Sequence, residues 1–303
     1  MKAKIQGVNK TVKNTNIPPP VIAAGDSNMA MFQATKAGLT KEMKLQVSSK
    51  KLALMFLSSS VHEMCTTGGS YAEYAISWSH TTFYLPHHIT FEEAATIPLA
   101  ALTAAVSLYA HHRLPSPWTP ALNPIPLIIY GASGAVGSYA IKLACNSNVH
   151  PIIAATAKGI SSCLKQAGHT SVWHAIDAAI VPQSAEVLRR VVAPGGQIDF
   201  ILPNDFDVAP ATKSVTSVGS FHNQPEFENN EELGYVFSRY ISRALQNGCL
   251  SGHPFEIRPG GLEGVEEALR DLKDGRASAM KYVFRIADTP GVEQDNLFNI
   301  IRV

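Results

Sequence analysis

The segment PLIIYGASGAVGSYAIKLAC, residues 126–145, passes from an apolar run through a group of glycines into a helical pattern. Residues 127–130 are apolar and are followed at once by glycine, which predicts a short buried strand of a parallel sheet. Val136, Ala140, Ile141 and Ala144 then recur at the spacing of one helix face. A strand, a glycine turn and a helix in this order form the context of a dinucleotide-binding fingerprint.

The turn itself has the spacing A-x-G-x-x-G, with Ala132 where the first glycine usually stands. Small residues let a backbone approach a pyrophosphate, and the N-terminus of the next helix offers free N–H groups and the positive end of its dipole. A tight strand-to-helix turn without a ligand is the alternative interpretation. The predicted pyrophosphate contacts are Gly131, Ala132, Ser133, Gly134, Ala135, Val136 and Gly137.

Apolar segments and helical patterns alternate after this unit. We expect strands at residues 151–157, 172–179, 196–202 and 215–221, and a helix at 184–192 that ends before Pro194-Gly195-Gly196. Such alternation predicts the α/β class, with a doubly wound parallel sheet.

The flanking segments are more mixed. Thr90 and Glu93 have the capping-box spacing, which predicts a helix start, and a second helical run extends from Pro98 to about His112. Residues 114–126 hold five prolines and predict a connection. Helices at 228–246 and 261–273 and a strand at 281–286 follow later, whereas residues 21–67 give a poor pattern in which 52–57 fits either a strand or a helix.

Composition excludes several classes of function. A net charge of +1 over 303 residues provides no field that would gather nucleic acid or an acidic membrane. The N-terminus lacks the apolar region of a signal peptide, and the uncharged run 94–110 is short for a membrane span. The four cysteines form no C-x-x-C pair, so we expect free thiols and a cytoplasmic protein. The expected partner is a small-molecule substrate, bound by a monomer or homodimer.

The second predicted strand bears on the choice of cofactor. An NAD site usually places an acidic residue at the end of this strand, about 20 residues past the glycines. Here the strand ends in Thr156-Ala157-Lys158, with no carboxylate. A hydroxyl and a cation suit a 2′-phosphate, so Thr156 and Lys158 predict NADP(H); the alternative is that Lys158 is only solvated.

The sequence contains neither the ligand pattern of a metal site nor the catalytic pair of a short-chain dehydrogenase. The histidines occur as the adjacent pairs 87/88 and 111/112, which do not converge naturally on one ion, and no cysteine cluster accompanies them. We therefore expect no metal site and interpret these histidines as solvated or capping. None of the nine tyrosines has a lysine four residues later, which removes the Tyr-x-x-x-Lys pair.

Several segments together resemble the zinc-independent medium-chain dehydrogenase/reductases, close to quinone oxidoreductases and trans-acting enoyl reductases. They occur in the family's order and cover about two thirds of the chain. The matching segments are GGSYAEYA (68–75), FEEAATIPLAALTAA (91–105), IIYGASGAVGSYAIKLA (128–144), APGG (193–196), PGGLEGVEEALRDLKDG (259–275) and SAMKYVFRI (278–286).

The resemblance implies a GroES-like catalytic domain built from residues 1–100 and 241–303, with a Rossmann domain at 101–240. It also implies NADPH as cofactor, with Ile201 and Leu202 lining the nicotinamide and Lys281 closing over it. Hydride would reach an activated double bond or a quinone while hydrogen bonds polarise the substrate carbonyl. Thr103 and Lys281 are the candidate catalytic residues, and the substrate would face Leu99, Ala100, Ala101, Leu102, Thr103 and Ala104.

The chain also departs from this family. An Asn-Pro-x-Asp-Trp-like segment is missing between residues 8 and 61, and residues 47–52 replace a Gly-Asp-Arg-Val turn. Between Gly159 and Ala167 the chain is shorter by about one βα unit. We therefore expect an NADPH-dependent reductase, with two alternatives: an impaired relative that binds NADP(H) or a partner without turnover, and a different Rossmann enzyme such as a methyltransferase.

Overall fold

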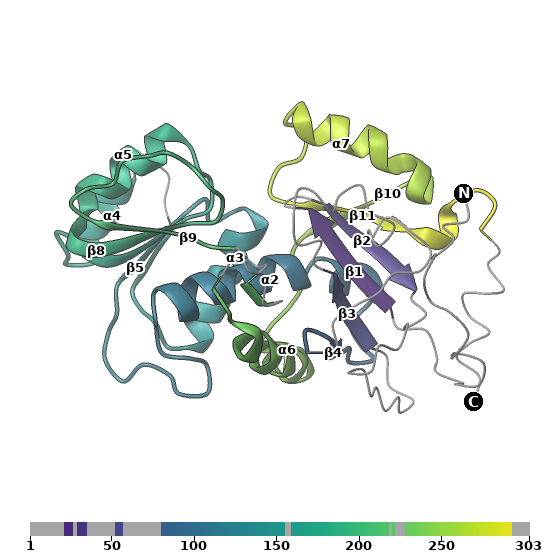
Figure 1. Ribbon diagram of the computed structural model, residues 1–303, viewed down its shortest axis with the longest axis horizontal. Coiled ribbons are helices and arrows are strands. Elements are labelled where there is room, and N and C mark those ends of the chain that lie inside the picture. The colour runs from purple at the N-terminus through teal and green to yellow at the C-terminus, as the bar shows by residue number, and fades with distance from the viewer. Residues whose placement is uncertain are drawn as a thin grey trace. The chain divides into compact units, whose positions relative to one another are not determined.

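The computed structural model describes residues 21–26, 29–34, 52–56, 80–154, 159–217, 220–221 and 228–292, the first three ranges as backbone only. These residues belong to two compact units (Figure 1). One unit consists of residues 100–218, and the other combines residues 1–99 with 219–303. The segment GGSYAEYA (68–75) of the resemblance lies outside the described residues, as do Thr156 and Lys158.

The unit of residues 100–218 is built on a five-stranded sheet in the order β6-β5-β7-β8-β9, and every neighbouring pair is parallel. The predicted α/β class with a doubly wound parallel sheet is confirmed. Helices α4 and α5 cover one face of the sheet, and α3 lies on the other (Figure 1). The strands are β5 (Leu127–Tyr130), β6 (Ile152–Ala154), β7 (Val172–Asp177), β8 (Val192–Phe200) and β9 (Thr212–Val215), and the helices α3 (Ala135–Asn146), α4 (Ile160–Gln166) and α5 (Pro182–Val191).

The strand order explains the short connection between Gly159 and Ala167. The classic dinucleotide-binding sheet has the order 3-2-1-4-5-6, in which a third strand flanks the second. Here the chain passes from β6 through α4 directly into β7, which pairs with β5. The order is therefore 2-1-3-4-5, and β6 has no outer neighbour among the described strands. This agrees with the predicted loss of one βα unit.

The core of this unit follows from the alternation of side chains in the strands. Ile198 and Phe200 of β8 point to the face covered by α4 and α5, where they pack with Leu164 and Leu188. The residue between them, Asp199, points to the opposite face. All five side chains are at most 2% exposed, so β8 has an apolar face and a face that buries a carboxylate.

The helical segment before the sheet begins as predicted. Thr90 caps α1 (Phe91–Ala95), because its hydroxyl accepts a hydrogen bond from the Glu93 N–H at 3.1 Å. Helix α2 (Pro98–Ala105) continues into the π-helical segment η2 (Val106–His111). The predicted run to about His112 is confirmed, and the π-helical geometry is an addition that the periodicity did not indicate. No described residue between 112 and 126 is helical or in a strand, as the prolines predicted.

The other unit contains a six-stranded mixed sheet in the order β10-β11-β2-β1-β3-β4, in which strands from both ends of the chain pair. Residues 52–56 of the ambiguous segment form a strand, and the β1–β2 hairpin and β10 were not predicted. Helix α7 packs on β11 through Ala268, Tyr282 and Phe284. The elements are β1 (Val21–Asp26), β2 (Met29–Ala34), β3 (Leu52–Phe56), β4 (Phe83–Tyr84), β10 (Phe255–Arg258), β11 (Lys281–Arg285), α6 (Glu231–Gln246), η4 (Gly261–Gly264), α7 (Val265–Lys273) and η5 (Ile286–Asp288).

The strand predicted at residues 215–221 is wrong. The observed strand β9 ends at Val215, because β8, its one partner in the part of the chain that the structure describes, ends at Phe200, which pairs with that residue. One further backbone bond, from the Thr216 N–H to the Phe200 carbonyl at 2.7 Å, completes the pairing. Among the described strands, none therefore pairs with the segment after Val215.

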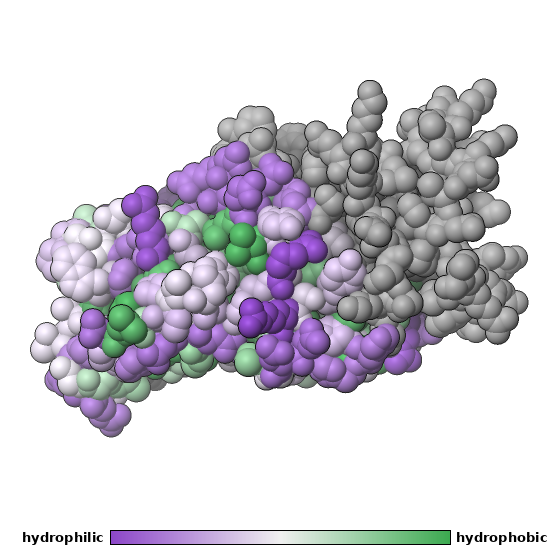
Figure 2. Space-filling view, turned by 90° about the horizontal axis from the view of Figure 1, so that it is seen from below, coloured by the Kyte–Doolittle hydropathy of each residue, from purple (hydrophilic) through white to green (hydrophobic). Residues whose placement is uncertain are grey.

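The described residues include no helix with the length and hydropathy needed to cross a bilayer. Figure 2 shows one face of the molecule, on which apolar residues form small patches between polar ones.

Candidate functional site

The residues of interest gather where β5, β7 and β8 end. In a doubly wound sheet, ligands bind at the carboxyl edge where the chain reverses its direction of strand addition. Strand β6 lies on one side of β5 and β7 on the other, so the switch point is between β5 and β7. The glycine turn follows β5 at this point, which agrees with a nucleotide site.

The glycine turn has two positions that only glycine fills. Gly131 has a φ of +77°, and a Cβ there would lie 2.9 Å from the carbonyl carbon of Ala178. A Cβ on Gly137 would lie 2.4 Å from the Gly131 carbonyl oxygen. Gly131 therefore makes the tight turn one residue before Ala132, and Gly137 lets the helix pack against it. The replacement of the first fingerprint glycine by alanine thus leaves the turn intact.

The start of α3 fits an anionic ligand. Gly134 is the N-cap residue, with extended geometry and without a side chain that could cap the helix. Its N–H donates to the Gly131 carbonyl at 3.0 Å, while Ser133 is exposed beside it. The residues that would hold a pyrophosphate are therefore small, and the first turn of the helix is free of a competing side-chain cap.

The turn after β7 is fixed by a buried carboxylate. Asp177 Oδ1 accepts hydrogen bonds from the N–H groups of Ala179 and Ile180 at 3.0 and 2.9 Å. Its second oxygen accepts a bond from the Ser184 hydroxyl. Asp177 is fully buried, and both of its carboxylate oxygens stabilise the turn against which Gly131 packs. It is therefore not placed to act as the ribose-binding acid of an NAD site.

The two residues expected to line a nicotinamide begin the loop after β8. The Ile201 N–H donates to the Asp177 carbonyl at 3.3 Å, which places Ile201 beside the turn that contacts Gly131. Ile201 is partly buried, and Leu202 is 53% exposed. The structure thus brings Ile201 and the glycine turn to the same sheet edge.

The remaining predicted residues differ in exposure. Thr103 on α2 is 7% exposed, and its neighbours Ala100, Ala101, Leu102 and Ala104 are at most 1% exposed. Leu99 is partly buried. Lys281 begins β11 in the other unit and is 1% exposed.

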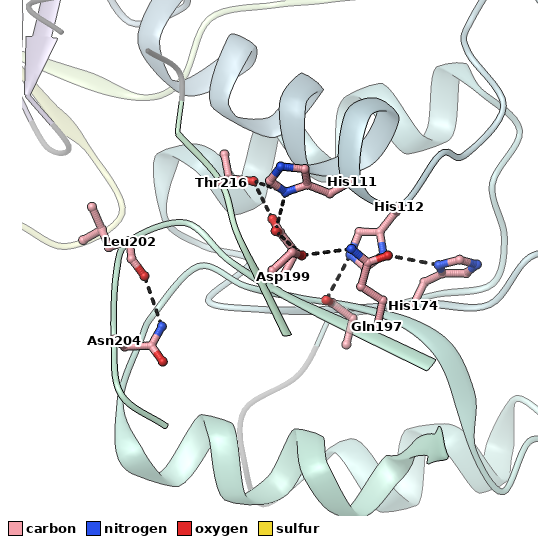
Figure 3. A network of polar contacts seen from close by, with 10 residues as sticks. His111, His112, His174, Gln197, Asp199, Leu202, Asn204 and Thr216 are labelled. Carbon is pink, nitrogen blue, oxygen red and sulfur yellow. Dashed lines mark hydrogen bonds and ion pairs between the residues drawn. The ribbon is translucent and has the colours of Figure 1, made fainter. Parts of the chain in front are cut away.

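A polar network that the sequence did not reveal lies under η2 (Figure 3). Asp199 Oδ1 lies 2.7 Å from Nδ1 of His111 and accepts a 2.6 Å bond from the Ser214 hydroxyl. Asp199 Oδ2 accepts a bond from the Thr216 hydroxyl, also at 2.6 Å. Burial by itself raises the pKa of Asp199, but the hydrogen bond and charge of His111 and the bond from Ser214 outweigh it and hold that pKa below its usual range.

The next residue, His112, belongs to a second contact with the sheet. Its Nε2 lies 3.1 Å from the Ala175 carbonyl oxygen, so the neutral ring carries its proton there, and its Nδ1 accepts from His174 Nδ1 at 3.3 Å. Burial lowers the pKa of His112 to about 4, His174 and His111 add to this, and Asp199 opposes it. Burial also lowers the pKa of His174.

These contacts correct the interpretation of the histidines. His87 and His88 are exposed, as expected, but His111 and His112 are neither solvated nor capping, because they pack on the sheet. The available signal was the carboxylate of Asp199 within an apolar strand, since a buried charge needs a partner. Among the described residues no group of three His, Cys, Asp or Glu side chains could hold a metal ion.

Comparison of sequences identifies relatives of this chain, although no family model matches it. A trans-enoyl reductase of Gibberella fujikuroi is 39% identical over 236 residues, which are 67% of this chain and 68% of that protein. A trans-enoyl reductase of Fusarium heterosporum is 23% identical over 255 residues, covering 73% of this chain and 72% of the relative.

Solved structures share the fold. A quinone oxidoreductase of Pseudomonas syringae matches with a TM-score of 0.58 at 16% identity, over 80% of this chain and 77% of that one. The enoyl reductase JamJ matches with a TM-score of 0.52 at 18% identity, over 68% and 66%. The enoyl reductase has the arrangement found here, a Rossmann unit combined with a GroES-like unit.

Proposed function

Because this chain belongs to the trans-enoyl reductases of the medium-chain dehydrogenase/reductase superfamily, we propose that it reduces an activated carbon–carbon double bond of an enoyl or enone substrate, or a quinone, with NADPH. The observation that carries this proposal is the glycine turn. Gly131 and Gly137 leave a backbone surface that a Cβ would fill, directly at the switch point of the sheet.

The residues present fit a dinucleotide. The uncapped start of α3 would hold the pyrophosphate, and Ile201 and Leu202 would offer an apolar surface to the nicotinamide. Lys158 and Thr156 are proposed for the 2′-phosphate on the sequence alone, because no acid stands at the end of the second strand. When bound, NADPH supplies the hydride that the β-carbon or the quinone ring accepts.

The protein would then have to polarise the substrate carbonyl and exclude water. The sequence offers no zinc ligand set, so hydrogen-bond donors would perform this task. We retain the Thr103 hydroxyl and the Lys281 ammonium as the proposed donors. Thr103 would lie with Leu99–Ala104 along the substrate.

A catalytically impaired relative that binds NADP(H) or a partner is the second candidate. The observation that favours it is the five-stranded sheet, in which the described residues provide no strand beyond β6. The missing unit would belong to the adenosine half of the site. Its loss would therefore weaken binding of the cofactor more than any other step.

Turnover of NADPH by the purified chain separates the two candidates. We expect NADPH oxidation with at least one of an enoyl thioester, an enone and a quinone, and slower oxidation of NADH. Thr103→Val should lower kcat about 100-fold while leaving the Kd of NADPH unchanged, since it removes one hydrogen-bond donor at nearly constant volume. NADPH binding without turnover of any substrate would favour the second candidate, and no binding would exclude both.

A further inference from the structure

The loop of residues 201–211 connects β8 to β9 at the carboxyl edge of the sheet. It begins with Ile201 and Leu202 and has no helix or strand of its own. Two backbone bonds join its ends to the sheet, from the Ile201 N–H to the Asp177 carbonyl and from the Gly195 N–H of β8 to the Pro210 carbonyl. Between these ends, side-chain bonds hold residues 202–206.

Asn204 closes the first part of this loop. Its Nδ2 donates to the Leu202 carbonyl at 3.1 Å, and its Oδ1 accepts from the Phe206 N–H at 3.1 Å. The first of these bonds is visible beside the polar network in Figure 3. The amide of Asn204 therefore fixes the backbone of Leu202, whose side chain is exposed.

Lys213 on β9 holds the same turn from the strand. Its Nζ donates to the carbonyl oxygens of Asn204 at 2.6 Å and of Phe206 at 3.1 Å. The ammonium also lies 5.5 Å from the centre of the Phe200 ring. Charge-assisted bonds are the stronger kind. The two carbonyls belong to Asn204 itself and to Phe206, whose N–H the Asn204 amide also binds.

The register explains why a lysine on an edge strand can reach this loop. Lys213 pairs with Ile198 in the parallel ladder, so its side chain lies on the same face as Phe200, two residues further along β8. From there the side chain extends toward the carboxyl edge. Lys213, although it lies on an otherwise apolar face of the sheet, can therefore bind the carbonyls of the loop.

We propose that Lys213, through Asn204, is a positioning residue that holds Ile201 and Leu202 in the conformation that contacts the nicotinamide. The inference rests on the proposed function, since it assumes that this loop faces the cofactor. A loop released from Lys213 would have to be ordered again when NADPH binds, and that cost would appear as weaker binding. The adenosine half of the cofactor would not bear this cost.

Binding of two ligands to the full chain tests the proposal. NADPH contains the nicotinamide, and adenosine 2′,5′-bisphosphate contains only the adenosine half with the 2′-phosphate. For Lys213→Met we expect the Kd of NADPH to rise about tenfold, and the Kd of the bisphosphate to change less than about twofold. Lys213→Arg should restore part of the NADPH affinity, because it keeps a cationic donor.

Lys273→Met, at the exposed end of α7, is the matched control and should leave both constants unchanged. Asn204→Ala provides a second variant if Lys213→Met does not fold, and it should weaken NADPH selectively as well. Equal weakening of both ligands, or no change in either, would overturn the role of Lys213 while the proposed function stands. Failure of the unmodified chain to bind NADPH would instead overturn the proposed function and, with it, this inference.

Discussion

Gly137 shows how one residue links the fold to the proposed cofactor site. Its missing Cβ leaves room for the Gly131 carbonyl, and Gly131 itself packs on the turn after β7. A methyl group at 137 would push the first turn of α3 away from the strand it follows. The same contact therefore determines both the packing of the helix and the surface offered to a pyrophosphate.

Gly137→Ala should destabilise the chain by about 2 kcal/mol, the usual cost of overpacking, and should abolish stabilisation by NADPH. Gly134→Ala is the matched control for stability, since its Cβ would lie 3.3 Å from the Gly131 carbonyl oxygen and φ at 134 is −70°. Chemical denaturation of the two variants measures the difference. Equal stability of the two variants would contradict the close approach at 137.

His112 should make stability depend on pH. The pKa of this ring is about 4 in the folded protein and about 6.5 in an unfolded chain. Between these values the unfolded chain binds a proton that the folded protein does not, so stability is complete above about pH 6.5 and falls as the pH decreases to about 4. The loss from this group amounts to roughly 3 kcal/mol, at about 1.4 kcal/mol per pH unit.

The measurement is the free energy of unfolding in urea at several values between about pH 7.5 and pH 4.5. His112→Gln should flatten this slope, with a remainder from His174, whose pKa is also lowered. The titration of Asp199 lies below this window, because its pKa is held below the usual 3.8. Parallel slopes for the variant and the unmodified chain would contradict the assignment to His112.

At the scale of elements, β9 forms contacts that its sequence pattern did not predict. Its residues Thr212–Val215 are mostly polar, so hydrophobic periodicity did not predict the strand. Yet Lys213 holds the loop after β8 on one face, and Ser214 binds Asp199 on the other. An edge strand can be specified by its polar partners, and these become visible only when the sheet order is known.

The apolar and capped elements were predicted well for the opposite reason. The strand at 127–130, the Thr90 cap and the end of the helix predicted at 228–246 each carry their signal within a few neighbouring residues. The network around Asp199 joins η2, β8 and β9, and its partners His111 and Asp199 are 88 residues apart in the sequence. No local pattern could have indicated that pairing.

The contact between η2 and the sheet can be tested at Asp199. In Asp199→Asn an amide nitrogen would face one of the donors now bound by the carboxylate, namely His111, Ser214 or Thr216. We expect a loss of about 3 kcal/mol in the free energy of unfolding, since one partner of a buried pair is removed. Glu186→Gln breaks an exposed pair with Arg190 and should change stability by less than about 0.5 kcal/mol. Similar effects of both variants would contradict a tie between η2 and β8.

At the scale of the whole molecule, the resemblance predicted more than the periodicity did. Only the ordered set of segments indicated that strands from both chain ends share one sheet, which the pairing of β11 with β2 bears out. The β1–β2 hairpin and β10 escaped prediction although Gly25-Asp26-Ser27-Asn28 and Pro259-Gly260-Gly261 are turn signals, because the strands themselves are short and show no clear alternation of apolar and polar residues. The missing βα unit was likewise expected from the resemblance, because the family commonly has a further strand where this chain passes from Gly159 to Ala167.

Thermal unfolding of the whole chain tests which nucleotide the shortened sheet still binds. A ligand bound only by the folded state at 100 times its Kd adds about 2.7 kcal/mol, which corresponds to a rise in Tm of about 5–10 °C for a chain of this size. We expect this rise with NADPH, a smaller one with NADH and none with S-adenosylmethionine.

Lys158→Ala should reduce the rise in Tm with NADPH to that seen with NADH, because it removes the cation proposed for the 2′-phosphate, whereas Lys273→Ala should not. Equal effects of the two pyridine nucleotides on the unmodified chain would contradict the preference for NADPH. A rise with S-adenosylmethionine alone would contradict the reductase and favour a methyltransferase, since the same sheet edge can serve either ligand.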